Sequence, residues 1–156
     1  MGTLWDEHIA VLVLVRHFGC LFCRQQIGQL LPHVSRIRAA GAEVVVVGNG
    51  SVEEARAFRD EQRLPVPLFT DPARDSYCAL EMRRGVATVL HPRVILNSFA
   101  AMLQGFRQTK PAGDPLQQGG VVVMAPNDIE RYRYVSKRAG DHPSPSAILR
   151  ALTPSA

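Results

Sequence analysis

The feature that most constrains the fold of this chain is an apolar, strand-like run followed closely by a helix. Residues Ile9 to Val15 are continuously apolar and rich in β-branched side chains, which is typical of a strand buried on both faces of a mainly parallel sheet. From Cys20 to Ala40 apolar side chains recur at helical spacing, and Gly41 provides a stop. Pro32 lies inside that helix without an amide hydrogen to donate, so we expect a kink there.

The alternation of strands and helices continues through the first half of the chain. Val44 to Val47 predicts a second buried strand, and Ser51 with Glu54 forms a capping box that starts a helix through about Arg63. Pro67 to Thr70 predicts a short strand. Asp71 as N-cap and Pro72 at the first helical position then predict a helix that carries Tyr77 and Cys78.

The second half predicts two further strands and a closing helix. Pro92 to Phe106 has a helical pattern and is expected to be an inserted helix. Val121 to Met124 and Ile129 to Val135 predict an antiparallel hairpin, and Ser144 with Pro145 caps a helix through Leu152. The whole order predicts an α/β, thioredoxin-like fold, in which helices flank a central mixed β-sheet and an inserted helix separates the two halves. The length of 156 residues and the 46% hydrophobic content favour one domain over residues 1–156.

Two of the three cysteines, Cys20 and Cys23, occupy the junction between the first strand and its helix. Backbone amides and the helix dipole stabilise a thiolate at a helix N-terminus, so Cys20 is a candidate nucleophile. Helical side chains three apart have Cβ atoms about 5 to 6 Å apart, whereas a disulfide needs about 3.8 Å. We therefore expect Cys20 at the cap and Cys23 in the first turn. Cys20 would attack a peroxide or a disulfide and Cys23 would resolve the product, provided that both sulfurs are accessible.

Several neighbouring residues are candidates for supporting roles. Arg16, or a protonated His17, would lower the pKa of Cys20, although His17 could equally be a general base or a residue that merely ends the strand. Gly120, in the Gln118-Gly119-Gly120 segment before a strand, would allow the backbone to approach the sulfurs closely. Cys78 is expected to be a buried structural thiol.

Two other interpretations of the cysteine pair stay open. Cys20 and Cys23 could be reduced core residues without function, or half of a zinc site. The zinc interpretation would need Cys78 and His142 to be recruited singly, because the sequence has no second cysteine or histidine pair at ligand spacing. We therefore predict neither a metal nor another cofactor, and keep a redox-inert interaction or metal-binding module as the alternative to an enzyme.

Four segments together resemble a known family. They are Val15 to Arg24, Phe69-Thr70-Asp71-Pro72, Gln118-Gly119-Gly120 and Ala139-Gly140-Asp141-His142-Pro143. In this order they resemble the peroxiredoxin-like family of alkyl-hydroperoxide-reductase/thiol-specific-antioxidant type, in the branch that includes selenoprotein-U-like proteins and prostamide/prostaglandin F synthases. The resemblance implies a thioredoxin fold, a redox-active cysteine pair and antioxidant or peroxide-reducing activity. The chain lacks the Pro-x-x-x-Thr/Ser-x-x-Cys arrangement of typical peroxiredoxins.

These features together predict a thiol-dependent oxidoreductase that acts on peroxides or organic hydroperoxides. A thioredoxin- or glutathione-type reductant would restore the two thiols. The same sulfurs could instead reduce a protein disulfide or an endoperoxide-type lipid. A homodimer is compatible with the sequence.

Composition and charge exclude several other classes of protein. The net charge of +4 comes from scattered basic residues without the dense cluster that nucleic-acid binding needs. No stretch reaches the roughly 20 apolar residues of a membrane span. Acidic Asp6 and Glu7 precede the first apolar run, unlike the basic start of a secretory signal, and the odd number of cysteines does not suit a secreted disulfide framework. We therefore expect a cytoplasmic location.

Overall fold

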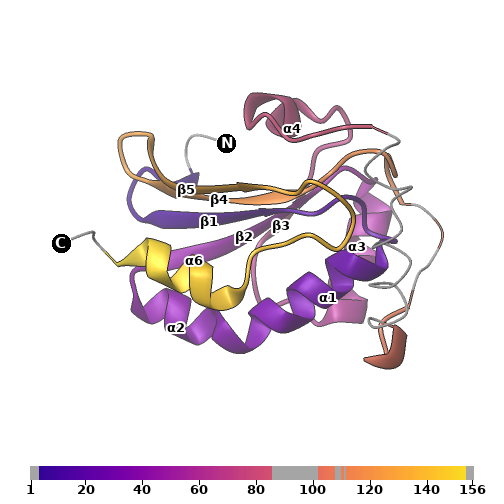
Figure 1. The fold of residues 1–156 in the computed structure, drawn as a ribbon, viewed down its shortest axis with the longest axis horizontal. Helices are drawn as coiled ribbons and strands as arrows, with labels where there is room; N and C mark the ends of the chain where they lie inside the picture. Colours follow the sequence, from indigo (N-terminus) through magenta and orange to yellow (C-terminus); the bar gives the residue numbers. More distant parts are fainter. Residues whose placement is uncertain (1–3, 86–101, 108–109, 111, 154–156) are drawn as a thin grey trace.

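The centre of the structure is a mixed sheet of five strands, in the order β3-β2-β1-β4-β5 (Figure 1). The structure is a computed structural model and describes residues 4–85, 102–107, 110 and 112–153. The strands are β1 (Ile9–Leu14), β2 (Ala42–Gly48), β3 (Leu68–Thr70), β4 (Gly120–Ala125) and β5 (Ile129–Val135). β1 pairs in parallel with β2 and antiparallel with β4. The predicted mixed sheet is confirmed.

Helices cover both faces of this sheet, unequally. They are α1 (Leu21–Leu30), the 3-10 turn η2 (Leu31–His33), α2 (Val34–Ala39), α3 (Val52–Gln62), α4 (Asp75–Ala79) and α6 (Pro145–Leu152). Figure 1 shows α1, α2, α3 and α6 on one face and α4 on the other. Pro32 lies in η2, so the predicted kink is confirmed as a 3-10 turn between α1 and α2. The inserted helix predicted for 92–106 lies mostly outside the described residues.

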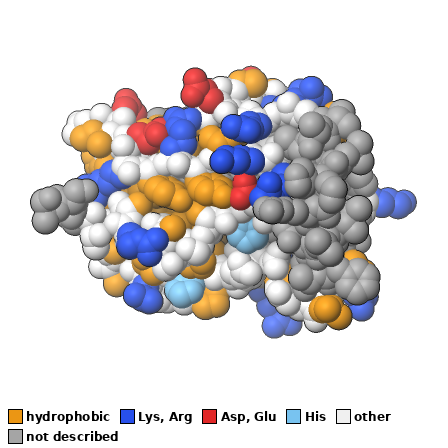
Figure 2. Space-filling view, in the orientation of Figure 1, with side chains coloured by type: hydrophobic (Ala, Val, Ile, Leu, Met, Phe, Trp, Pro, Cys, Tyr) orange, Lys and Arg blue, Asp and Glu red, His pale blue; other side chains and the backbone are white. Residues whose placement is uncertain are grey.

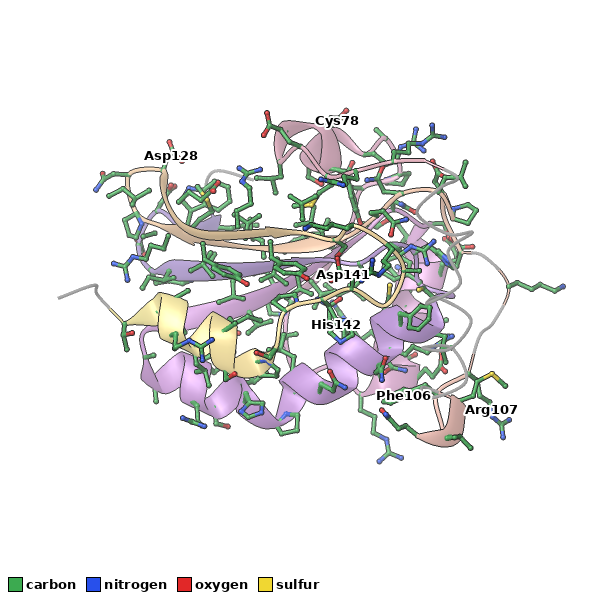
Figure 3. The ribbon with its side chains drawn as sticks, viewed as in Figure 1. Cys78, Phe106, Arg107, Asp128, Asp141 and His142 are labelled. Carbon is green, nitrogen blue, oxygen red and sulfur yellow. The ribbon has the colours of Figure 1, made fainter. Side chains whose placement is uncertain are left out.

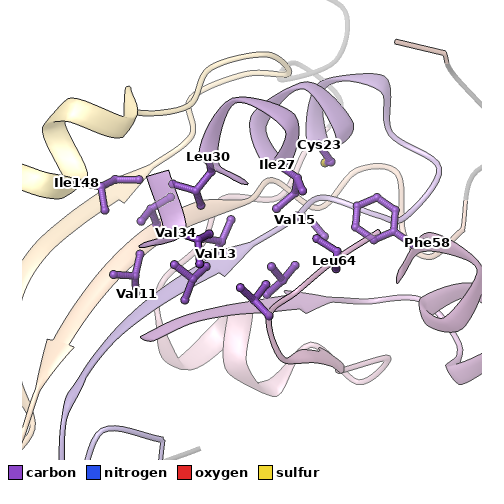
Figure 4. Close-up of a cluster of buried hydrophobic side chains, with 14 of the residues drawn as sticks. Val11, Val13, Val15, Cys23, Ile27, Leu30, Val34, Phe58, Leu64 and Ile148 are labelled. Atoms are coloured by element: carbon purple, nitrogen blue, oxygen red, sulfur yellow. The ribbon is translucent and has the colours of Figure 1, made fainter. Parts of the chain in front are cut away.

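β1 is buried on both faces, as its continuous apolar sequence predicts. Val11, Val13 and Val15 face the larger cluster under α1, α2 and α6 (Figure 4), whereas Leu12 and Leu14 face the second cluster. Fully burying an aliphatic side chain of this size contributes about 1.5 to 3 kcal/mol. The strand is therefore anchored from both sides up to the point where the cysteine segment begins.

Local capping rules place two of the other helices correctly. The Ser51 hydroxyl accepts from the Glu54 amide at 3.2 Å, and the Ser51 amide donates to the Glu54 carboxylate at 2.8 Å, which is the predicted capping box of α3. Ser144 caps α6 by accepting from the Ala147 amide at 3.3 Å. β4 and β5 form the predicted antiparallel hairpin.

The prediction for Asp71 is wrong in its position relative to the helix. α4 begins only at Asp75, after Arg74 in the left-handed region at φ 65°. The Asp71 amide donates to the Gly48 carbonyl at 2.7 Å, so its backbone still extends the sheet. Its carboxylate instead accepts from the Asp75 amide at 3.2 Å and the Ser76 amide at 2.8 Å, and so stabilises the helix start from upstream.

The prediction of a buried Cys78 is also wrong. Cys78 is an exposed free thiol on α4, and Figure 3 shows it across the sheet from α1, which carries Cys23. The surface charge is mixed: Figure 2 shows basic side chains spread over the visible face, among acidic and hydrophobic ones. No helix in the described part of the chain is long and apolar enough to cross a membrane.

Candidate active site

The structure places the cysteine pair at the start of α1, as predicted. Cys20 is the N-cap, with the extended backbone of φ −76° and ψ 122°, and Cys23 lies in the first helical turn. The Cys20 amide donates to the His17 carbonyl at 3.1 Å, and the Cys20 carbonyl accepts from the Arg24 amide at 3.2 Å. Both cysteines are free thiols. The turn that follows β1 thus places both cysteines at the N-terminal end of α1.

The expectation that the sulfurs are accessible is wrong for this conformation. Cys20 is 1% exposed and Cys23 is 3% exposed. Residues from a distant segment lie against the start of α1: the Arg107 carbonyl accepts from the Arg24 guanidinium at 2.9 Å, and Gln104 accepts from Gln25 at 3.0 Å. The pair is therefore closed to any large reactant in this state.

Arg16 contacts both sulfurs. Its Nη1 donates to the Cys20 Sγ at 3.5 Å, and its backbone amide donates to the Cys23 Sγ at 3.2 Å. The rest of the guanidinium is held by two backbone carbonyls, that of Pro115 at 2.6 Å from Nη2 and that of Gln117 at 3.3 Å from Nε. Carbonyls orient a cation without neutralising it, and within the described ranges no carboxylate forms an ion pair with Arg16. The positive charge is therefore available to a thiolate at Cys20.

The pKa values of the two thiols are shifted in opposite directions. The Cys23 thiol, within hydrogen-bonding reach of the Cys20 sulfur, is the main cause that lowers the pKa of Cys20 to about 6; burial opposes this effect and the Arg16 charge adds to it. Burial, followed by the hydrogen bond and charge of Cys20, raises the pKa of Cys23 well above its usual value. Of the two, Cys20 is thus the more acidic thiol and Cys23 the weaker acid beside it.

His17 does not supply the cation that the sequence suggested. Burial, together with the nearby charges of Arg16 and Arg24, lowers the pKa of His17 to about 4, so its ring is neutral at neutral pH. His17 Nδ1 accepts from the Ala112 amide at 3.5 Å, and the Phe18 amide donates to the Ala112 carbonyl at 3.1 Å. His17 therefore helps to hold the segment at Ala112 against the site.

Gly120 does not bring the backbone to the sulfurs. A side chain at Gly120 would lie 2.4 Å from the Tyr134 carbonyl oxygen and 2.6 Å from the Met82 sulfur, so its missing side chain makes room for β5 and Met82. The neighbouring Gly119 is the glycine at the site: a side chain there would lie 2.0 Å from the Leu14 carbonyl oxygen, at the end of β1. The close approach at Gly119 is thus to the backbone of β1 and Arg16, whereas the prediction for Gly120 was an approach to the sulfurs.

Asn49 and Asp114 are site-supporting residues that the sequence did not reveal. The Asn49 side chain donates to the Arg16 carbonyl at 2.7 Å and accepts from the Asp114 amide at 2.8 Å. The Asp114 carboxylate binds Arg74 and, at 2.8 Å, Arg84. These contacts fix the loop whose carbonyls orient Arg16. Only spatial proximity links these residues, and no local pattern in the sequence marks them.

A small cavity reaches Cys23 from the side of the β5–α6 connection. It leaves about 10 Å³ for the centre of a water molecule, which is room for one water. Its walls include Arg16, Cys23, Gly119, Ser136, Arg138, Asp141 and His142. A larger cavity of about 580 Å³ lies between β3 and α4 and touches neither cysteine. Among the described residues, no group of three or more histidine, cysteine or acidic side chains could hold a metal ion.

Comparison with known proteins identifies the family. Residues 29–138 match the family described as AhpC/TSA antioxidant enzyme, which is well over half of the chain. The chain belongs to the AhpC/TSA antioxidant enzyme family. The matched segment contains Gly119, Asn49 and Asp114 but begins after Cys20 and Cys23, so family membership by itself says nothing about the sulfurs.

Individual relatives cover almost all of this chain. It is 32% identical over 97% of its length to "Thioredoxin-like protein AAED1, chloroplastic" of Arabidopsis thaliana, and spans 64% of that protein. It is 28% identical over 97% of its length to "Peroxiredoxin-like 2C" of Homo sapiens, of which it spans 71%. It is also 28% identical over 97% of its length to "Prostamide/prostaglandin F synthase" of Homo sapiens, of which it spans 79%. The chain is therefore similar to proteins named after the predicted branch, the prostamide/prostaglandin F synthases.

Solved structures show the same fold. Enterococcus faecalis AhpC superimposes with a TM-score of 0.68 at 12% identity, over 96% of this chain and 74% of that chain. The thioredoxin domain of a Bacteroides vulgatus thiol-disulfide oxidoreductase superimposes with a TM-score of 0.53 at 11% identity, over 95% of this chain and 81% of that chain. The thioredoxin-like fold predicted from the order of elements is confirmed.

Proposed function

We propose that this chain reduces peroxides or organic hydroperoxides through a dithiol/disulfide cycle of Cys20 and Cys23. The observation that carries the proposal is the pairing of an acidic thiol and a weakly acidic thiol at one helix start, with the Arg16 guanidinium 3.5 Å from the acidic sulfur. An attacking thiol and a resolving thiol need this difference in acidity.

The cycle begins with the Cys20 thiolate attacking the terminal oxygen of a hydroperoxide. The O–O bond breaks, the remainder leaves as water or an alcohol after taking up a proton, and Cys20 becomes a sulfenic acid. The Cys23 sulfur then attacks the Cys20 sulfur, which forms the disulfide and releases water. One thioredoxin-type dithiol, or two molecules of a glutathione-type thiol, then supplies two electrons and two protons, restores both thiols and is itself oxidised to a disulfide.

Burial of the pair favours a small substrate. With Cys20 1% exposed and room for about one water beside Cys23, hydrogen peroxide or a short hydroperoxide needs less rearrangement than an endoperoxide-type lipid. A protein reductant needs a local opening of the segments that cover α1, and small-molecule peroxide reduction can precede that opening. Lipid or protein-disulfide reduction therefore stays the secondary candidate, although one relative is named prostamide/prostaglandin F synthase.

Three further expectations belong to the proposal. The reductant would be a thioredoxin- or glutathione-type thiol, the location would be cytoplasmic, and a homodimer is compatible with the structure. The chain spans 64% of the Arabidopsis relative, so the activity of the full-length protein is also part of the proposal.

The decisive experiment measures peroxide consumption with a thioredoxin-type donor by the wild type and three matched serine variants. Cys20→Ser should abolish turnover. Cys23→Ser should retain one reaction per molecule and then stop. The exposed Cys78→Ser serves as the control and should leave turnover unchanged, since Cys78 lies on the other side of the sheet. Full turnover by Cys20→Ser would contradict the assigned roles, and no peroxide-dependent thiol loss in the wild type would refute the function.

A further inference from the structure

The cavity beside Cys23 contains a histidine that the proposed cycle does not yet use. His142 lies on the segment between β5 and α6, and Figure 3 shows it with Asp141 next to α1. Both residues line the same cavity as Cys23. The cavity has room for one water, and a water there would lie among walls that include both His142 and Cys23.

The hydrogen bonds of His142 determine which ring nitrogen is basic. Its Nε2 lies 3.1 Å from the Gln29 Oε1. An amide oxygen only accepts, so this contact is a hydrogen bond in the tautomer that carries the hydrogen on Nε2. Nδ1 is then the nitrogen with a free lone pair, and it has no hydrogen-bond partner within the described ranges. Burial lowers the pKa of His142, with an opposing effect from Asp141, so the ring is neutral near neutral pH. His142 is therefore held in the form that can take up a proton.

We propose that His142 accepts the proton of the Cys23 thiol, through one water in this cavity, when Cys23 attacks oxidised Cys20. The inference rests on the proposed dithiol cycle and adds the missing base for its second step. The S–H bond of Cys23 breaks and its proton passes to His142 Nδ1. The resulting thiolate attacks the Cys20 sulfenic sulfur, and the departing hydroxide takes up a proton to leave as water.

The state of Cys20 controls when this transfer becomes favourable. Two of the causes that raise the pKa of Cys23 are the hydrogen bond and the negative charge of Cys20. Both disappear once Cys20 has reacted, which leaves burial, the largest of the three causes, as the one that still opposes ionisation of Cys23. The positive charge of Arg16, whose amide donates to the Cys23 sulfur at 3.2 Å, then favours the thiolate. The base is thus needed after the first step and not before it.

The charged groups around the cavity are compatible with a transient imidazolium. Arg16 and Arg138 line it, and both disfavour a lasting positive charge on His142. Asp141 favours that charge; its carboxylate is anchored by the Tyr134 hydroxyl and by the Lys137 amide at 2.7 Å. The balance of two cations against one carboxylate returns the proton to the leaving group or to solvent, as a relay requires.

The test separates the two chemical steps by rapid quenching in a Cys78→Ser background. Hydrogen peroxide is added to the reduced protein, samples are alkylated at short times, and mass spectrometry counts free thiols, sulfenic acid and disulfide. In His142→Gln, formation of the Cys20 sulfenic acid should keep its rate, whereas disulfide closure should slow at least about tenfold near neutral pH. The rate of disulfide formation in the variant should also rise steadily with pH, because hydroxide replaces the lost base.

The control is His33→Gln, which removes a histidine of η2, outside the cavity. It should leave both rates unchanged. If wild type forms the disulfide and His142→Gln closes it at the same rate with the same pH profile, the relay is refuted while the cycle survives. If wild type loses no thiols to peroxide, the proposed function itself has failed. Should His142→Gln fail to fold, the pH profile of closure in Gln29→Leu, which frees the tautomer, gives the alternative test: an unchanged profile contradicts the relay.

Discussion

Removing the positive charge of Arg16 should raise the pKa of Cys20, and the size of the rise follows from the contact between the two side chains. In Arg16→Gln the charged donor 3.5 Å from the Cys20 Sγ is lost. A hydrogen bond to a charged group contributes about 1.5 to 3 kcal/mol, and this long contact belongs at the lower end. Since about 1.4 kcal/mol corresponds to one pKa unit, the pKa of Cys20 should rise from about 6 to about 7.

The consequence for reactivity depends on pH. At a pH of about 6 the thiolate fraction should fall from about one half to about one tenth, so the rate constant for peroxide should drop about fivefold. Two pH units higher, both proteins are almost fully ionised at Cys20, and the ratio of their rate constants should approach one. The measurement is the ultraviolet absorbance of the thiolate against pH in a Cys78→Ser background, together with stopped-flow peroxide kinetics.

A second arginine variant controls for the general loss of one positive charge. Arg36→Gln, on the exposed part of α2, changes the net charge equally and should not move the titration. Arg16→Lys should give an intermediate pKa, because it keeps the charge but loses the planar fork that the Pro115 and Gln117 carbonyls hold. A Cys20 titration in Arg16→Gln that coincides with the wild type would refute the assigned role of Arg16.

Three further predictions concern the scaffold and its pH dependence. Gly119→Ala should lower the free energy of unfolding by at least about 1 to 3 kcal/mol, because the new Cβ would lie 2.0 Å from the Leu14 carbonyl oxygen. Gly85→Ala, with nothing within 4 Å of the new Cβ, is the control and should be nearly neutral, so equal urea midpoints for the two variants would contradict this packing. Tyr77→Phe should cost about 1 to 3 kcal/mol in the same assay, since the buried hydroxyl donates to the Val15 carbonyl at 2.6 Å, and an unchanged midpoint would show that this bond is dispensable. The wild-type rate constant for peroxide should rise through a pH of about 6 and level off above it, because the thiolate reacts; a rise centred near the ordinary thiol value would contradict the acidity of Cys20.

The parts of the fold that were predictable depend on interactions close in sequence. Ile9 to Val15 reads as a doubly buried strand because every position is apolar, and the capping box of Ser51 and Glu54 is complete within one turn. The position of Cys20 follows from the strand that precedes it and the helical pattern that follows. Asp71 misled the prediction because its local sequence suits an N-cap, while its amide is already used by the Gly48 carbonyl of the neighbouring strand.

The electrostatics of the site were less predictable, because they come from residues far apart in sequence. The carbonyls of Pro115 and Gln117 hold Arg16 from a stretch that reads only as a loop. Burial makes His17 a neutral ring, and burial depends on how the segment at Ala112 packs over it. The choice between Gly119 and Gly120 depends on the strand register, which a run of glycines does not specify.

The chemistry assigned to the two sulfurs is tested most directly by mapping where one equivalent of hydrogen peroxide oxidises the reduced protein. Peptide mass spectrometry should find a bond between Cys20 and Cys23 with Cys78 still alkylatable, and Cys23→Ser should yield a sulfenic acid trapped on Cys20. Oxidation confined to Cys78, or a trapped sulfenic acid on Cys23 in Cys20→Ser at the wild-type rate, would contradict the account.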